Sequence, residues 1–108
     1  MKTLEQQIQE LTDREEIKEL TAHYAHGVAR GEGARVAGLF TDDGVFINRL
    51  TPNDPPTVVR GRAELDKFYG AIKRNTAVPC IHNHLITLAG DEANGTCSIE
   101  VRITRNKR

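Results

Sequence analysis

Tryptophan is absent from this sequence, and cysteine, methionine and aromatic residues are scarce. Its 108 residues include two cysteines, one methionine and only 5% aromatic residues. Cys80 and Cys97 lie in apolar segments and lack the C-x-x-C spacing of redox and metal motifs. The sequence therefore predicts free thiols in a reducing compartment rather than a disulfide scaffold.

An excess of charge of either sign is also missing. Lys and Arg together number 15, as do Asp and Glu, which gives a formal net charge of zero. Surfaces that bind nucleic acid or anionic membranes need a basic excess, and a membrane helix needs about 20 consecutive apolar residues. Neither is present, and the first residues, Met1 to Gln7, are unlike a signal peptide. The composition predicts a cytoplasmic protein that binds neither nucleic acid nor membrane.

The length fits a single domain, residues 1–108, and the hydrophobic pattern places helices before strands. Apolar residues recur three and four positions apart from Leu4 to Val28, which predicts a helix. A kink or restart is expected near Thr12, where the period breaks and a doubled capping signal begins. Gly31 is expected to end this helix. The pattern predicts further helices over residues 34–40 and 62–74.

Four segments have the apolar pattern and turn signals of strands. The first two flank a proline-rich loop at residues 51–56, and the last two flank a turn at Gly90 and Asp91, so each pair is expected to form an antiparallel hairpin. Such an order predicts an α+β fold, in which a curved antiparallel or mixed sheet wraps around the N-terminal helices as a cone with a pocket inside. The predicted strands are residues 45–47, 57–60, 78–88 and 96–104.

A series of short segments is distinctive in its order and spacing. The segments are EIKEL at 16–20, YAHGV at 24–28, LFTDDGVF at 39–46, GRAEL at 61–65, and HNHL followed by GDEANGTC within 82–97. Together they resemble the SnoaL-like family of the nuclear transport factor 2-like superfamily, which includes scytalone dehydratase and the bile-acid dehydratases. The resemblance covers essentially the whole chain and implies the cone fold. It does not define the reaction, because the superfamily includes dehydratases, isomerases, epoxide hydrolases, cyclases and binding proteins.

The sequence departs from this family in two places. Members usually carry an aspartate five residues after the helix tyrosine, whereas here Ala29 follows Tyr24 at that distance. Alanine can neither take up a proton nor orient a water molecule. Members also continue with two more strands after the strand that holds Glu100, whereas this sequence stops at Arg108. Its C-terminal strands are therefore expected to be shortened: either the chain is a piece, or the far wall of the pocket is absent or comes from a partner.

Two histidines of the last hairpin are the main candidates for acid–base chemistry. With a two-residue turn, directly opposed residues sum to 181, which places His84 opposite Cys97 and His82 opposite Ile99. Strand alternation then puts both histidines on the apolar face that points to the core. A neutral imidazole there can take up or deliver a proton near physiological pH. The alternative is a pair of hydrogen-bonded core histidines.

Tyr24 lies on the apolar stripe of the first helix, so its hydroxyl is expected to face the sheet and to bond a ligand or a histidine. The resemblance implies that this tyrosine helps to polarise a substrate carbonyl. We assign the apolar wall of the pocket to Phe46, Phe68, Cys97 and Ile99.

The other candidate sites are weaker. His26 and His23 point away from the apolar stripe and are expected at the surface. The pair His82-x-His84 has no strong third ligand beyond the two thiols, so no metal is expected. The sequence contains no nucleotide-binding fingerprint, and no cofactor is expected.

These observations favour a cofactor-free dehydratase or isomerase acting on a small, apolar, oxygenated substrate such as a polyketide, steroid or terpenoid. His82 and His84 would be its acid–base pair and Tyr24 its carbonyl donor. One alternative is a non-catalytic ligand-binding protein, with Ala29 marking the lost chemistry. Another is an assembly domain that dimerises through the convex sheet face, where Ile81 is expected. Because the net charge is zero, a homodimer or higher homo-oligomer is expected in either case.

Overall fold

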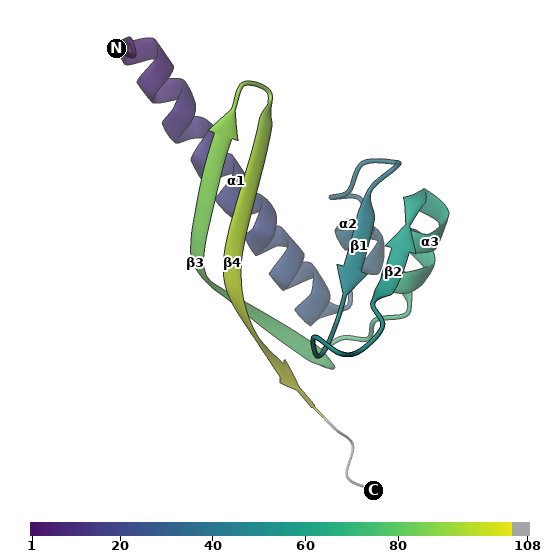
Figure 1. Cartoon of the computed structure of the whole chain (residues 1–108). Coiled ribbons are helices and arrows are strands. Elements are labelled where there is room, and N and C mark those ends of the chain that lie inside the picture. Colours follow the sequence, from purple (N-terminus) through teal and green to yellow (C-terminus); the bar gives the residue numbers. More distant parts are fainter. Residues whose placement is uncertain (105–108) are drawn as a thin grey trace, which may run out of the picture.

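Helices precede strands along the chain, as predicted (Figure 1). The computed structural model describes residues 1–104. The elements are α1 (Leu4–Arg30), α2 (Gly33–Ala37), β1 (Val45–Asn48), β2 (Thr57–Arg60), α3 (Gly61–Gly70), β3 (Ala77–Ala89) and β4 (Glu92–Ile103). The α+β class is confirmed. The end of the chain at residues 105–108, where the expected shortening falls, lies outside the described residues.

Helix α1 is continuous, so the prediction of a restart near Thr12 is wrong. Its N-terminal cap is Thr3, whose hydroxyl accepts a hydrogen bond from the Gln6 amide, while the Gln6 side chain accepts one from the Thr3 amide. This capping box begins the helix, and extending a formed helix costs less than nucleating a second one. Gly31 ends α1 as predicted, with a left-handed φ of 70°.

The described strands form two separate antiparallel hairpins. Strand β1 pairs with β2, and β3 pairs with β4. In Figure 1 the long β3–β4 hairpin lies along α1, whereas α2, β1, β2 and α3 gather near the C-terminal end of that helix. The curved sheet predicted from the sequence is thus present as two antiparallel pairs, with α1 packed along β3.

An aromatic cluster at the junction of α1, α2 and α3 forms the core. Tyr69 is 1% exposed, and its ring contacts those of Tyr24, Phe40, Phe46 and Phe68 at centroid distances of 5.0 to 5.9 Å. Aromatic rings carry large apolar areas, so this cluster supplies much of the burial in a protein with few aromatic residues. Leucine, valine and alanine side chains complete the core.

The close approach of α2 to α3 requires glycine at residue 33. A Cβ atom on Gly33 would overlap the carbonyl oxygen of Tyr69. The packing of α2 against the aromatic cluster therefore depends on the missing side chain.

Arg62, at the start of α3, ties that helix to the C-terminal end of α2. Its two terminal nitrogens donate to the carbonyls of Ala37 and Phe40, both at 2.6 Å. Its Nε lies 3.3 Å from the carboxylate of Asp42. The guanidinium therefore gives the Phe40 carbonyl a donor and adds a second donor to the Ala37 carbonyl, which also accepts from the Phe40 amide.

Alkaline pH is expected to unfold the protein as the tyrosines ionise. Burial and the bond to Tyr24 raise the pKa of Tyr69, and burial raises that of Tyr24 despite the opposing effect of that bond. Tyrosines of the unfolded chain ionise near about pH 10. The stability that the two protonated tyrosines contribute to the folded state is therefore complete below that pH. It is lost as pH rises above it, because the unfolded state gives up its phenol protons more readily than the folded state.

The measurement is a titration followed by phenolate absorbance and far-ultraviolet circular dichroism. The chain has two tyrosines and no tryptophan, so the absorbance reports on this pair alone. We expect both signals to change in one coincident transition. Phenolate absorbance that rises while the dichroism stays constant would contradict the structure.

Candidate functional site

A β-bulge in β3 determines which side chains of the long hairpin face α1. Between the turn and the pair Leu85–Thr96, the residue numbers of each opposed pair add up to 181, as predicted. Between His82 and Leu85 the register shifts by one residue, and Asn83 adopts a left-handed φ of 53°. Asparagine tolerates this conformation better than most residues, and such an extra residue is what a bulge accommodates.

The bulge moves His82 to the outer face, so the prediction that the two histidines share a face is wrong. His82 pairs with Ser98 instead of Ile99. Its Nε2 lies 3.8 Å from a carboxylate oxygen of Glu100, and half of its side chain is exposed. The alternation argument assumed an unbroken strand, and the extra residue reverses the phase of every position before it.

The same shift changes the composition of both faces. Ile81 pairs with Ile99 on the inner face, so it cannot belong to the convex interface predicted from the sequence. Leu85 lies after the bulge on the outer face and is 72% exposed. The outer face therefore loses Ile81, keeps Leu85, and gains Cys80, which pairs with Glu100.

His84 is half-buried on the inner face. A Cβ atom on Gly95 of the neighbouring strand would come within 3.2 Å of its Nε2, so the glycine leaves room for the imidazole. The ring lines a hollow of about 530 Å³ between α1 and β3, with Ala22, Ala25 and Cys80 among its walls. This arrangement gives one imidazole a largely apolar environment next to space for a small molecule.

His26 lines the same hollow from α1, although the sequence placed it at the surface. Its side chain is exposed, as predicted, but the hollow also borders a face of α1 next to its apolar stripe. That face carries Lys18, Thr21 and Ala25. Helical periodicity alone could not reveal it, because these residues do not form an apolar stripe.

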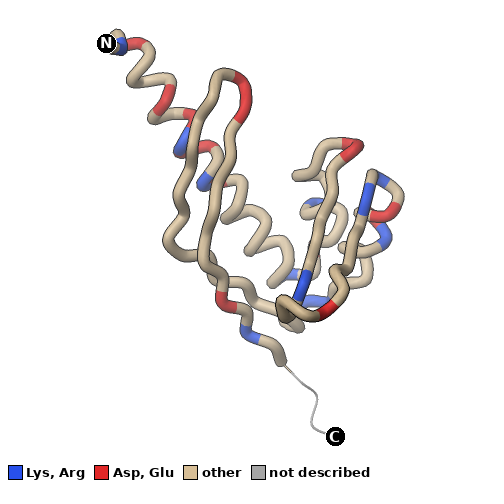
Figure 2. The backbone as a smooth tube through the Cα atoms, in the orientation of Figure 1, with Lys and Arg blue, Asp and Glu red and all other residues tan. Residues whose placement is uncertain are grey.

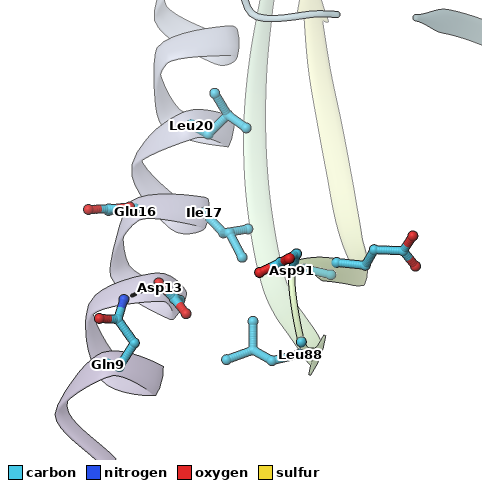
Figure 3. Close-up of a pocket in the computed structure, with 10 residues that line it drawn as sticks. Gln9, Asp13, Glu16, Ile17, Leu20, Leu88 and Asp91 are labelled. Carbon is cyan, nitrogen blue, oxygen red and sulfur yellow. Dashed lines mark hydrogen bonds between the residues drawn. The ribbon is translucent and has the colours of Figure 1, made fainter. Parts of the chain in front are cut away.

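A second hollow of about 720 Å³ lies between α1 and the tip of the hairpin (Figure 3). Ile17 and Leu20 of α1 and Leu88 of β3 point into it. Acidic side chains lie at its rim, among them Asp13 and Asp91. Ile17 and Leu20 belong to the apolar stripe that continues to Tyr24, so this hollow opens on the side of α1 that the sequence assigned to the pocket.

Tyr24 bonds another tyrosine rather than a histidine. Its hydroxyl lies 2.8 Å from that of Tyr69. Both rings belong to the aromatic cluster, and the site predicted from the sequence is therefore divided between that cluster and the hairpin. The described structure gives no contact between Tyr24 and either His82 or His84.

Of the four residues assigned to the apolar wall, two lie in the aromatic cluster and two lie on the β3–β4 hairpin. Phe46 and Phe68 pack together in the aromatic cluster, with ring centroids 5.4 Å apart. Cys97 and Ile99 lie on the inner face of β4, but both are exposed. Within residues 1–104 no element covers that part of the inner face.

Residues 1–104 contain no group of three or more His, Cys, Asp or Glu side chains arranged to hold a metal ion. In the same part of the chain, no helix combines the length and apolar character that crossing a membrane requires.

The arrangement of helices followed by antiparallel hairpins defines an α+β fold. The fold is similar to that of ActVI-ORFA from Streptomyces coelicolor, with a TM-score of 0.58 and 19% sequence identity over 88% of this chain and 73% of that one. At this level of identity the likeness concerns the fold.

The family follows from the sequence itself. A model of the SnoaL-like domain matches residues 9–108, and the chain belongs to this family. It is also similar to a steroid Delta-isomerase from Nocardioides simplex, with 39% identity over 59 residues. That match covers 53% of this chain and 43% of the isomerase, so the chain spans less than half of that relative.

Proposed function

We propose that this chain is a cofactor-free isomerase or lyase of the SnoaL-like family that moves a proton on a small, apolar, oxygenated substrate, with His84 as its acid–base residue. The observation that carries the proposal is the position of His84. It is a half-buried imidazole on an apolar sheet face, beside a hollow of about 530 Å³. A positioned imidazole that takes up a proton in the transition state accelerates a reaction about 100- to 10,000-fold.

Proton abstraction next to a carbonyl also requires a donor for the oxygen that gains charge. We assign this role to Tyr24. If the Tyr69 hydroxyl donates to the Tyr24 oxygen across their 2.8 Å contact, the proton of Tyr24 is free for a substrate oxygen. The bond from Tyr69 would then strengthen Tyr24 as a donor, since hydrogen bonds in a chain polarise one another.

This assignment places the substrate between the apolar stripe of α1 and the inner face of the hairpin. Leu20 and Leu88 line one end of that space, and His84 lies further along β3. His82 has no part in the proposed proton transfer, because it lies on the outer face beside Glu100.

The substrate class is proposed from the chemistry of the walls and from one relative. The walls of the hollow beside His84 are mostly apolar, and Lys18 is the one lysine or arginine among the described residues that line it. The similarity to a steroid Delta-isomerase favours a steroid or another polycyclic ketone, in which a double bond moves after a proton is removed and returned. Such a reaction needs one base and one oxygen donor, which His84 and Tyr24 would supply.

A second candidate function is ligand binding without chemistry. Ala29 favours it, because the family's aspartate at this position is replaced by a residue that cannot carry a proton. In the structure Ala29 has a structural role through its carbonyl, which accepts a hydrogen bond from the Asn75 amide at 2.8 Å.

The two candidates differ in a direct assay. The chain is incubated with a ketosteroid whose double bond is one carbon removed from conjugation, and the absorbance of the conjugated product is followed. We expect the protein to accelerate conjugation above the buffer rate, and we expect the product ketone to inhibit by competition. Saturable binding of the steroid without any acceleration would reject the enzyme and support the binding protein. Neither binding nor acceleration across a panel of steroid, terpenoid and polyketide ketones would reject both.

A further inference from the structure

The two hollows beside α1 carry side chains of opposite charge. The hollow beside His84 has no aspartate or glutamate among the described residues that line it, and Lys18 is its one lysine or arginine. The hollow at the hairpin tip has the reverse composition, because no lysine or arginine is among its described lining residues, and four carboxylates are: Asp13, Glu16, Asp91 and Glu92. In a chain without net charge, each hollow therefore has a local charge of its own.

The strand wall of the hollow beside His84 is uncharged. No lysine, arginine, aspartate or glutamate occurs in β3 between Ala77 and Ala89, and Figure 2 shows this strand in tan beside a helix that carries both charges. Pro79 and Ile81 contribute apolar surface from this strand. Because such a wall screens charge less than water does, an anion held against it is attracted more strongly by a nearby ammonium group.

Lys18 lies at the same end of this hollow as His84. The position follows from a hydrogen bond between the two elements, in which Arg14 of α1 donates to the carbonyl of Ile86 in β3 at 2.6 Å. Lys18 comes one helical turn after Arg14, and His84 comes two residues before Ile86. His26 lies two turns beyond Lys18, toward the other end of the hollow.

The ammonium group of Lys18 is available to a ligand. None of the ion pairs within residues 1–104 involves Lys18, although Glu15 and Glu19 are close in sequence. Its side chain is exposed, long and flexible, so it can turn toward the hollow. The nearby Thr21 hydroxyl already donates to the Lys18 carbonyl at 2.9 Å, so it offers an anion no proton. The principal donor for an anion is therefore Lys18.

We propose that this hollow binds an apolar monocarboxylate, with the carboxylate on the Lys18 ammonium and the hydrocarbon part against β3 and the alanines of α1. Its volume of about 530 Å³ suits a small organic molecule. A hydrogen bond between ammonium and carboxylate is stronger than one between neutral groups. A phosphate ester fits less well, because the described lining offers one ammonium and no guanidinium for the additional charge.

The proposal goes beyond the proposed reaction, because binding requires no proton transfer. It names a ligand class for the enzyme and for the non-catalytic binding protein alike. The ketosteroid assay described above uses neutral compounds, so its result does not depend on carboxylate recognition.

Three probes with the same fused ring test the charge preference: 2-naphthoate, 2-naphthamide and 2-naphthylmethylammonium. Titration calorimetry at about pH 8, above the range in which histidines usually hold a proton, leaves Lys18 as the charged group of the hollow. We expect naphthoate to bind at least about threefold more tightly than either other probe, and salt to reduce this preference. A preference for the amide or the amine, or no saturable naphthoate binding up to millimolar concentration, would overturn the proposal.

Lys18→Glu is the variant that tests the assigned residue, and Lys67→Glu is its matched control. Both change the net charge equally, and Lys67 is an exposed lysine of α3 that does not line this hollow. Lys18→Glu is expected to weaken naphthoate binding about tenfold, with naphthamide binding within about twofold of that of the unaltered chain. Lys67→Glu is expected to leave both affinities within about twofold. Equal losses of naphthoate binding would show that net charge holds the anion, and would overturn the assignment.

Nuclear magnetic resonance of the alanine methyl groups locates the bound probe. Ala22 and Ala25 line the hollow beside His84, whereas Ala93 lines the acidic one. Naphthoate is expected to shift the signals of Ala22 and Ala25 and to leave that of Ala93 in place, and the reverse pattern would overturn the proposal. Circular dichroism checks that each variant keeps its fold. Because these readouts concern binding alone, any of the results leaves the proposed catalytic role of His84 to its own assay.

Discussion

Replacing His84 by alanine is expected to reduce the rate of conjugation of a ketosteroid substrate about 100-fold or more, while binding of the product ketone changes little. The substitution removes the imidazole that the proposal assigns to proton transfer. Because the ring is only half-buried and lines open space, its loss should leave no large cavity in the core. The measurement is the rate with saturating substrate, together with the inhibition constant of the product.

His82→Ala is the matched control for this result. His82 is in the same strand two residues away, but its side chain is on the outer face, half-exposed beside Glu100. We expect its rate to stay within about twofold of that of the unaltered protein. Equal losses in the two variants would show that the bulge does not separate the two histidines functionally, and the role of His84 would then have to be abandoned.

Replacing Tyr69 by alanine is expected to lower the free energy of unfolding by about 3–5 kcal/mol. The ring is 1% exposed and contacts the four other rings of the aromatic cluster. Its removal would leave a large cavity where α1, α2 and α3 meet. Since a domain of this size has roughly 5–15 kcal/mol in total, the variant is expected to lose a large share of its stability. Urea denaturation followed by circular dichroism measures the change.

Tyr69→Phe separates the ring from its hydroxyl. This variant keeps the packing and removes only the bond to Tyr24, so a loss of about 1 kcal/mol is expected. If the phenylalanine variant were as unstable as the alanine variant, the hydroxyl pair rather than the ring packing would hold the core together. A small loss in both would contradict the central place of Tyr69.

Local sequence signals predicted most of the fold. The Gly31 cap, the hairpin turn at residue 90 and the proline-rich loop each depend on a few neighbouring residues, and all occur as predicted. The break expected near Thr12 is absent, although capping patterns lie at both Thr3 and Thr12. The earlier cap begins the helix, and nothing local stops it at the later one.

The candidate site could be predicted only in part, because its geometry depends on contacts distant in sequence. Asparagine at residue 83 is compatible with a bulge, but a strand pattern does not show where the register shifts. The bond between Tyr24 and Tyr69 joins residues 45 positions apart. The sequence showed that both side chains point inward, but not that they meet. His84 was placed correctly on the inner face because it lies between the bulge and the turn.

The tie between α2 and α3 has a consequence for interpreting pH profiles. It is made by the guanidinium of Arg62 on two backbone carbonyls, and a guanidinium stays protonated under any conditions that a protein tolerates. The tyrosine pair gives up protons only in strongly alkaline solution. Neither contact therefore changes state over the range in which histidines gain and lose their charge. A rate that varies with pH across that range would therefore report on imidazole chemistry. It would not reflect a change in the contact between α2 and α3 or in the tyrosine pair.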